Sequence, residues 1–231
     1  MVVKFETGCD MKKRCVCIIS GGMDSALSAK LAQNEGYEIV AVHFNYNQRT
    51  EQKELECFRK IADALNAVES YEIDLPFFEH IGASALTDKR IEVPTCGIEE
   101  GVPVTYVPFR NGIFLSIAAA IAEKHGAEAL YIGVVEEDSS GYPDCRESYI
   151  EQMQKAINLG TKDETHLTIK MPLVALKKSQ IVQKALALGV PLADTWSCYK
   201  EEERACGVCD SCRLRLKGFK EAGVTDPILY A

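Results

Sequence analysis

Residues 15–25 read CVCIISGGMDS, a short apolar run that leads directly into a turn with two glycines. The run has the length and the β-branched content of a buried strand. Residues 26–32 are mostly alanine and leucine and suit a helix, which Gly36 can end in a left-handed conformation. A strand, a glycine turn and a helix in this order predict an α/β fold.

The same alternation continues along the chain. Apolar runs predict four more strands, at residues 37–44, 68–75, 129–134 and 167–171. Helical spacing or a continuous apolar stretch predicts further helices at residues 51–65, 112–125, 146–159 and 176–188. We expect Asn111 to cap the second of these helices, and residues 87–108 to form a loop over the sheet. The pattern predicts a doubly wound, parallel five-stranded sheet with helices on both faces.

Composition and charge exclude several classes of protein. The chain has 231 residues, of which 47% are hydrophobic and 26% charged, as in an average globular protein. A net charge of −8 argues against a protein that grips nucleic acid backbones. No apolar run has the length of a bilayer crossing, and residues 1–14 lack the apolar region of a secretory signal. We therefore expect a cytoplasmic protein that does not contact membranes.

The turn at residues 20–25 carries a strong chemical signal. Its two glycines leave backbone N–H groups open to an anion, and the following helix directs its positive end at the same point. The alternative is an ordinary Gly-Gly turn capped by Asp24 or Ser25. The string S-G-G-x-D-S lacks the lysine of a Walker-type loop and the third glycine of a dinucleotide fingerprint. It resembles the loop of the pyrophosphate-loop ATPases, which have the adenine-nucleotide alpha-hydrolase-like fold.

That resemblance implies a role for the loop. It would bind ATP and hold the leaving pyrophosphate while a substrate oxygen attacks the α-phosphate, with Mg²⁺ shared among the phosphates. The implied ATP-binding residues are Ile19, Ser20, Gly21, Gly22, Met23, Asp24, Ser25, Ala26, Leu27, Ser28 and Ala29.

The end of the chain differs from the rest in its cysteines. Four of the ten are clustered, at Cys198, Cys206, Cys209 and Cys212. Four thiolates at this spacing can close a tetrahedral shell around a structural Zn²⁺. A redox C-x-x-C pair and an iron–sulfur cluster are the alternatives, and spacing alone does not separate iron–sulfur from zinc.

The cysteine cluster also suggests a domain boundary. We predict an α/β domain at residues 14–193 and a small zinc-binding helical subdomain at residues 194–231, too short to hold a core of its own. The basic residues after the cluster either offset the thiolate charge or form a solvated helix face. They are Arg213, Arg215, Lys217 and Lys220.

Further motifs extend the resemblance over nearly the whole chain. They are VPFRN at 107–111 with FLS at 114–116, GV at 133–134 with DSSGYPDCR at 138–146, PL at 172–173 with Lys178, TWSCY at 195–199, and DPILY at 226–230. Together with the ATP loop, in this order and spacing, they resemble the 7-cyano-7-deazaguanine synthase family, which makes the nitrile base used for queuosine. The most specific single stretch is SGYPDCR.

The resemblance implies an ATP-dependent carbon–nitrogen ligase. Its substrates would be 7-carboxy-7-deazaguanine and ammonia, and its product 7-cyano-7-deazaguanine. The carboxylate is adenylated, ammonia displaces AMP to give an amide, and a second ATP activates the amide oxygen before loss of AMP leaves the nitrile. AMP and pyrophosphate are the expected nucleotide products. The family resemblance also suggests a homodimer.

The same resemblance suggests roles for individual residues. The candidate catalytic residues are Asp24, Lys178 and Arg110. Asp24 would hold magnesium or orient the pyrophosphate, and Lys178 would neutralise charge on the phosphates. Arg110 would bind the substrate carboxylate or a phosphate. Candidate substrate-binding residues are Arg110, Asn111, Tyr142, Asp144 and Arg146. Each has a structural alternative: Asp144, for example, is also placed to cap the helix that begins near Arg146.

One motif departs from the family. The family commonly has Y-G-Q-R/K-H after the second strand, where this chain has Tyr46-Asn47-Gln48-Arg49-Thr50. Asn47 tolerates the left-handed conformation of a glycine, whereas Thr50 replaces an aromatic, titratable side chain. The alternative function is therefore a paralogue that transfers the activated deazaguanine to another amine. A tRNA-thiolation or lysidine-type enzyme and a zinc-stabilised nucleotide-binding module without catalysis are weaker alternatives.

Overall fold

The computed structural model describes residues 13–95, 101–136 and 141–231. Its centre is a five-stranded sheet in the order β3-β2-β1-β4-β5, in which every neighbouring pair is parallel. The strands are β1 Arg14–Ile18, β2 Glu38–Asn45, β3 Glu69–Asp74, β4 Ala129–Tyr131 and β5 Thr168–Lys170. The predicted sheet is confirmed, and β4 and β5 are shorter than their apolar runs.

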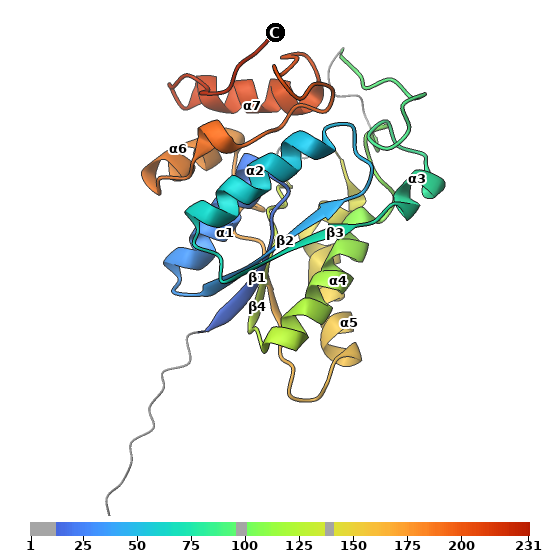
Figure 1. The fold of residues 1–231 in the computed structure, drawn as a ribbon, viewed down its shortest axis with the longest axis vertical. Helices are drawn as coiled ribbons and strands as arrows, with labels where there is room; N and C mark the ends of the chain where they lie inside the picture. The colour runs from blue at the N-terminus through green and yellow to red at the C-terminus, as the bar shows by residue number, and fades with distance from the viewer. Residues whose placement is uncertain (1–12, 96–100, 137–140) are drawn as a thin grey trace, which may run out of the picture.

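Helices cover both faces of this sheet (Figure 1). They are α1 Met23–Asn34, α2 Glu51–Ala64, α3 Phe77–Ile81, α4 Arg110–His125, α5 Glu147–Gly160, α6 Lys178–Ala187 and α7 Asp210–Glu221, with single 3₁₀ turns at Pro143–Cys145 and Leu192–Asp194. The short α3 was not predicted. No helix in the described ranges combines the length and the apolar character that a membrane crossing needs.

The strands divide their side chains between two hydrophobic cores. Cys15 and Cys17 of β1 pack with α1, α2 and α6 on one face, whereas Val16 and Ile18 pack with α4 and α5 on the other. Alternate residues of a strand point to opposite faces, so a strand buried on both faces reads as a continuous apolar run. The strands β2 and β3 follow on one side of β1 in the sheet, whereas β4 and β5 follow on its other side. The switch lies between β1 and β4, where doubly wound sheets bind ligands.

The end of the chain packs against the α/β core. Phe219 of α7 belongs to the core beneath α1 and α2, and Trp196 contributes to a third cluster with Cys57 of α2. Arg215 is buried, and its guanidinium donates to both oxygens of Asp226, from Nε at 2.7 Å and from Nη2 at 2.9 Å. Arg215 therefore neither offsets the charge of the thiolates nor lies on a solvated helix face, so both interpretations are wrong for this residue. The boundary at residue 194 stays a prediction.

Two backbone details modify the sequence expectations. Asn111 does not cap α4: Phe109 precedes the helix in a left-handed conformation with φ 54°, and Asn111 lies inside the first turn. Asn47 has φ 59°, so it adopts the left-handed conformation for which asparagine substitutes for glycine.

Candidate active site

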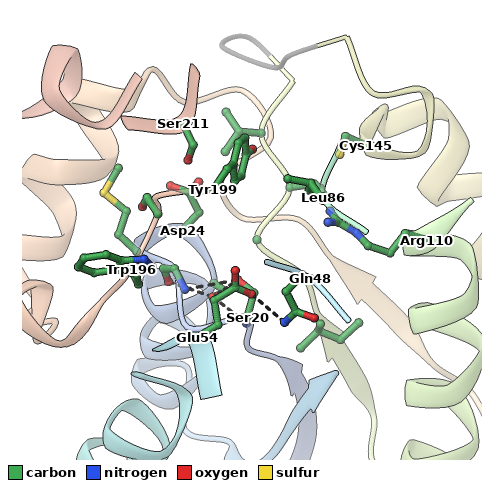
Figure 2. A pocket seen from close by; sticks show the side chains of 18 of the residues that line it. Ser20, Asp24, Gln48, Glu54, Leu86, Arg110, Cys145, Trp196, Tyr199 and Ser211 are labelled. Carbon is green, nitrogen blue, oxygen red and sulfur yellow. Dashed lines mark hydrogen bonds between the residues drawn. The ribbon is translucent and has the colours of Figure 1, made fainter. Parts of the chain in front are cut away.

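A cavity of about 270 Å³ opens at the carboxyl ends of β1, β2 and β4, at the switch point of the sheet. The loop after β1, the segment after β2, the start of α4 and the tail segment that begins at Trp196 all contribute to its wall. Figure 2 shows Asp24 and Trp196 on one side of this pocket and Arg110 on the other. Residues far apart in the sequence therefore form one site.

The loop between β1 and α1 is held in shape by its own hydrogen bonds. Ser25 Oγ accepts from the Ser20 N–H at 3.1 Å and donates to the Gly22 carbonyl at 3.0 Å. The helix α1 begins at Met23, and Gly22 before it offers no side chain to cap the first N–H groups, which lie at the cavity. The hydroxyls of Ser20 and Ser25 lie 3.2 Å apart.

Two glycines permit close approaches around this loop. Gly21 has φ +88°, and a Cβ there would lie 2.5 Å from the backbone oxygen of Glu54. A Cβ on Gly133, after β4, would lie 2.7 Å from the Ser25 nitrogen. Both contacts are too short for any side chain, so these glycines set how closely α2 and the end of β4 approach the loop.

Asp24 and Lys178 form an ion pair in the cavity wall. Lys178 is the first residue of α6, and its Nζ lies 2.8 Å from Asp24 Oδ2. A Cβ on Gly218 of α7 would lie 2.5 Å from Lys178 Cγ, so the lysine stem passes directly over a glycine. Asp24 Oδ1 is buried and has no hydrogen-bond partner among the described residues. An acceptor oxygen left open beside an anion-binding loop fits Mg²⁺, which prefers oxygen ligands.

Arg110 supplies a positive charge on the other side of the cavity. Its Nη1 donates to Tyr46 Oη at 2.9 Å, and its guanidinium lies 5.5 Å from the Tyr46 ring centre and 5.8 Å from that of Phe114. Its Nε is buried without an acceptor, and none of the ion pairs among the described residues includes Arg110. This charged group is held by aromatic faces and a neutral hydroxyl, which leaves it available to a planar anion.

Asp144 supports the start of α4 and is not among the residues that line the cavity. Its Oδ2 accepts from the Asn111 N–H at 2.9 Å, while Asn111 Nδ2 donates to the Asp144 carbonyl at 3.3 Å. Burial raises the pKa of the neighbouring Cys145 to about 12, so this thiol is neutral near pH 7. Asp144 thus caps α4 rather than the helix near Arg146.

The structure brings together most of the predicted site residues. The cavity is lined by Ile19, Ser20, Gly22, Met23, Asp24, Ser25, Arg110, Asn111, Tyr142 and Lys178. The remaining candidates do not line it: Gly21, Ala26, Leu27, Ser28, Ala29, Asp144 and Arg146. Ala26, Leu27 and Ala29 pack in the core, so these residues position α1 instead of facing the pocket.

Sequence reasoning did not assign several lining residues, above all Gln48, Glu54 and Tyr199. The motif around Gln48 was noticed only as a departure from a family pattern. Glu54 sits in the first turn of α2, where an acidic residue ordinarily needs no explanation beyond the helix dipole. No periodicity or spacing distinguishes it from a surface glutamate.

The four clustered cysteines lie together beside this cavity. Their Sγ atoms are all within 4.8 Å of one another, and Cys198 Sγ accepts from the N–H groups of Lys200, Glu201 and Cys206 at 3.4 Å each. Sulfur atoms in a tetrahedral zinc shell are about 3.8 Å apart, given a Zn–S length of about 2.3 Å. The geometry and the N–H donors fit a thiolate-bound metal. The tail also contacts the loop between β1 and α1 directly, because the Trp196 N–H donates to the Gly21 carbonyl at 2.9 Å.

Comparison with known proteins identifies the family of this chain. The family model "Queuosine biosynthesis protein QueC" matches residues 14–223. A curated protein of Sulfurovum sp. (strain NBC37-1), named 7-cyano-7-deazaguanine synthase, is 82% identical over 220 residues, which cover 95% of this chain and 99% of that protein. A protein of the same name from a Nitratiruptor species is 68% identical over 217 residues, covering 94% and 98%. The chain therefore belongs to the QueC family of queuosine biosynthesis proteins.

Proposed function

We propose that this protein converts 7-carboxy-7-deazaguanine and ammonia to 7-cyano-7-deazaguanine, with cleavage of two ATP to AMP and pyrophosphate. The names of its relatives support the product. One observation in the structure supports this chemistry: the glycine loop at the start of α1 and the Arg110 guanidinium, which has no carboxylate partner among the described residues, line the same cavity. A triphosphate and a carboxylate are the two anions that the first step has to bring together.

The residues divide the first step between them. The loop from Ser20 to Ser25 and the start of α1 hold the phosphates, and Arg110 orients the substrate carboxylate toward the α-phosphate. Lys178, which is paired with Asp24, stabilises the charge that builds on the departing pyrophosphate. Asp24 Oδ1 is the atom that would hold Mg²⁺, and a bound Mg²⁺ would neutralise phosphate charge.

The later steps use the same cavity. Ammonia forms a C–N bond at the adenylated carboxyl carbon, and AMP leaves with the electron pair of the C–O bond. The amide oxygen is then adenylated by a second ATP, and loss of AMP with two N–H protons leaves the nitrile. The aromatic side chains of Tyr142 and Tyr199 line the cavity and offer faces for a bicyclic base.

We further propose that the four cysteines bind one structural Zn²⁺, and that the protein is a cytoplasmic homodimer. The sulfur geometry supports the metal, and the family resemblance supports the dimer and the location. Cys198, Cys206, Cys209 and Cys212 would fill all four positions of the metal, so it would supply folding energy rather than catalysis.

A product assay tests the function. The protein is incubated with ATP, MgCl₂, ammonium and 7-carboxy-7-deazaguanine, and every product is identified by mass. The expected outcome is free nitrile base with two AMP for each nitrile. Absence of any acid-dependent AMP formation would contradict the proposal.

The replacement of the family histidine by Thr50 favours one alternative. Thr50 lines the cavity, so this departure alters the site itself. An enzyme that transferred the activated acid to a macromolecular amine would form one AMP for each modified acceptor. The same assay separates the two functions by the ratio of AMP to product.

A further inference from the structure

Glu54 is a carboxylate in the cavity wall that the steps above leave without a role. It is partly buried, and the adjoining turn of α2 touches the ATP loop at Gly21. Thr50 Oγ1 donates to Glu54 Oε1 at 2.7 Å, and Gln48 Nε2 donates to Glu54 Oε2 at 3.1 Å. Figure 2 shows Gln48 and Glu54 joined in this way beside Ser20. The carboxylate is therefore fixed in orientation at the loop that binds phosphate.

The partners of Glu54 orient it but do not neutralise it. Thr50 and Gln48 are both uncharged, and Glu54 takes part in none of the ion pairs among the described residues. Each carboxylate oxygen has a second acceptor position besides the one that its neutral partner fills. A carboxylate placed in this way is complementary to a small cation with several N–H donors.

A carbonyl oxygen lies beside Thr50, the first partner of Glu54. The carbonyl of Cys198 lies 3.2 Å from Thr50 Oγ1, and the single hydroxyl proton of Thr50 serves the shorter contact to Glu54. The Cys198 carbonyl and the lone pairs of Thr50 Oγ1 remain as acceptors. Acceptors thus outnumber donors around Glu54, which favours a ligand that only donates.

The charges that face Glu54 oppose one another. Arg110, on α4, lowers the pKa of Glu54, and Glu202, in the tail, raises it. Asp24 and Lys178 compensate each other as an ion pair. Lys53, on the same helix, pairs with Glu56. Burial is the largest influence and raises the pKa of Glu54 to about 7, against the hydrogen bonds from Thr50 and Gln48. This carboxyl group can therefore exchange a proton near neutral pH.

We propose that Glu54 binds the ammonium ion and accepts a proton from it, so that neutral ammonia is released next to the adenylated substrate; this rests on the function proposed above. An N–H bond of ammonium breaks and its proton moves to a Glu54 oxygen. The nitrogen lone pair then forms the C–N bond while the C–O bond to AMP breaks, and a second N–H proton passes to solvent. Ammonium is the dominant form of the nitrogen donor near pH 7 but cannot attack, so a proton acceptor at this position removes a barrier.

The test compares two nitrogen nucleophiles in the wild type and in Glu54→Gln. Glutamine keeps the size of the side chain and an oxygen for Thr50, but it carries no charge and accepts no proton. With ammonium as donor, we expect kcat/KM for ammonium to fall about 100-fold near pH 7. With hydroxylamine, which is mostly neutral at that pH, hydroxamate formation should stay within about threefold of wild type. The matched control is Glu51→Gln, one turn earlier on α2, whose carboxylate does not line the cavity.

The pH profile provides a readout that a structural role would not affect. In Glu54→Gln the rate with ammonium should follow the concentration of free ammonia and approach wild type at high pH. In the wild type, the rate near neutral pH should be higher than the concentration of free ammonia predicts. An unchanged KM for ammonium in Glu54→Gln, or an equal loss with hydroxylamine, would overturn the proposal.

A second measurement separates this inference from the proposed function. Acid-dependent exchange of pyrophosphate into ATP, without ammonium, tests adenylation and should survive Glu54→Gln. Ammonium chloride should raise the Tm of the wild type more than tetramethylammonium chloride at equal ionic strength, and this difference should vanish in Glu54→Gln. Absence of pyrophosphate exchange in the wild type would contradict the proposed adenylation and not the ammonium site. Absence of an ammonium-specific Tm shift in the wild type, or its persistence in the variant, counts against the ammonium site.

Discussion

At the scale of single residues, the cavity contains polar atoms of charged side chains that have no hydrogen-bond partner among the described residues. Arg110 has aromatic faces and a tyrosine hydroxyl where a buried guanidinium usually has a carboxylate, and Asp24 keeps one oxygen open. Such groups cost folding free energy, because a charge removed from water is not fully compensated. A bound ligand would compensate this cost.

Arg110→Met should therefore separate binding from stability. The variant removes an uncompensated charge but keeps an apolar stem against Tyr46 and Phe114, so the free energy of unfolding should be unchanged or higher. The kcat/KM for the carboxylic acid should fall roughly 30-fold or more, about 2 kcal/mol, with KM for ATP little changed. Steady-state kinetics and urea unfolding measure both. Arg59→Met, which breaks only an exposed pair with Glu72, is the control, and a large loss of stability in Arg110→Met would contradict this account.

Asp24→Asn tests the role of Asp24 Oδ1, which has no hydrogen-bond partner among the described residues. Asparagine preserves the shape but removes the charge that pairs with Lys178 and the anionic oxygen available to Mg²⁺. Acid-dependent pyrophosphate release should fall by about 100-fold or more, while far-UV circular dichroism stays that of the wild type. Full activity in this variant would remove Asp24 from the site.

Glu54 makes the stability of the protein depend on pH. Its pKa rises from 4.5 to about 7 on folding, so the native state binds this proton more tightly than the unfolded chain does. The contribution to stability is then fully present below about pH 4.5 and is lost as the pH rises through about 7. Glu54→Gln should gain about 1–2 kcal/mol relative to wild type between pH 5 and pH 8, after allowance for partial exposure. Urea unfolding at several pH values measures this, and a pH-independent difference would contradict it.

At the scale of elements, close packing determines how the loop between β1 and α1 contacts its neighbours. Gly133 follows β4 and lies against the first turn of α1 with no room for a Cβ. Gly133→Ala should push these elements apart, lower stability by about 1–3 kcal/mol and reduce adenylation more than tenfold. Gly160→Ala, at the end of α5 where a Cβ meets nothing within 4 Å, should keep both properties. Thermal unfolding and pyrophosphate exchange report the difference, and equal behaviour of the two variants would refute it.

At the scale of the whole molecule, the tail and the α/β core share one site. The Trp196 N–H bonds the Gly21 carbonyl, and Thr50 lies against the Cys198 carbonyl, so the cysteine cluster is connected to the cavity on two sides. If the four cysteines bind the proposed Zn²⁺, the metal would hold this part of the cavity wall in place.

Cys209→Ser should remove the metal and disturb the site together. We expect near-stoichiometric zinc in the wild type, loss of that zinc in the variant, and a lower Tm, because the free energy of thiolate binding is folding free energy. Trp196 is the sole tryptophan of the chain and is buried, so its fluorescence should shift to longer wavelength when the metal is lost. Elemental analysis together with fluorescence checks this. Retained zinc in Cys209→Ser would contradict the four-cysteine site.

The sequence by itself determined the order of the strands along the chain, the glycine turn after β1 and the group of four cysteines. These features are local: a strand buried on both faces is apolar throughout, a glycine turn needs adjacent glycines, and the four cysteines lie in one short segment. The family motifs added Arg110 and Lys178 to the candidate site, and the structure places both in the cavity wall.

Only the tertiary structure decided which side chains face the cavity. It placed Asp144 under the start of α4, buried Arg215 against Asp226, and turned Glu54 toward the phosphate loop. The role of a charged residue depends on partners from distant segments and on its burial away from water. Neither is visible in the sequence, so charged residues with different roles look alike there. That is the physical reason why composition and spacing recognised the loop and the cysteines, while the carboxylate that we assign to ammonium emerged from the fold.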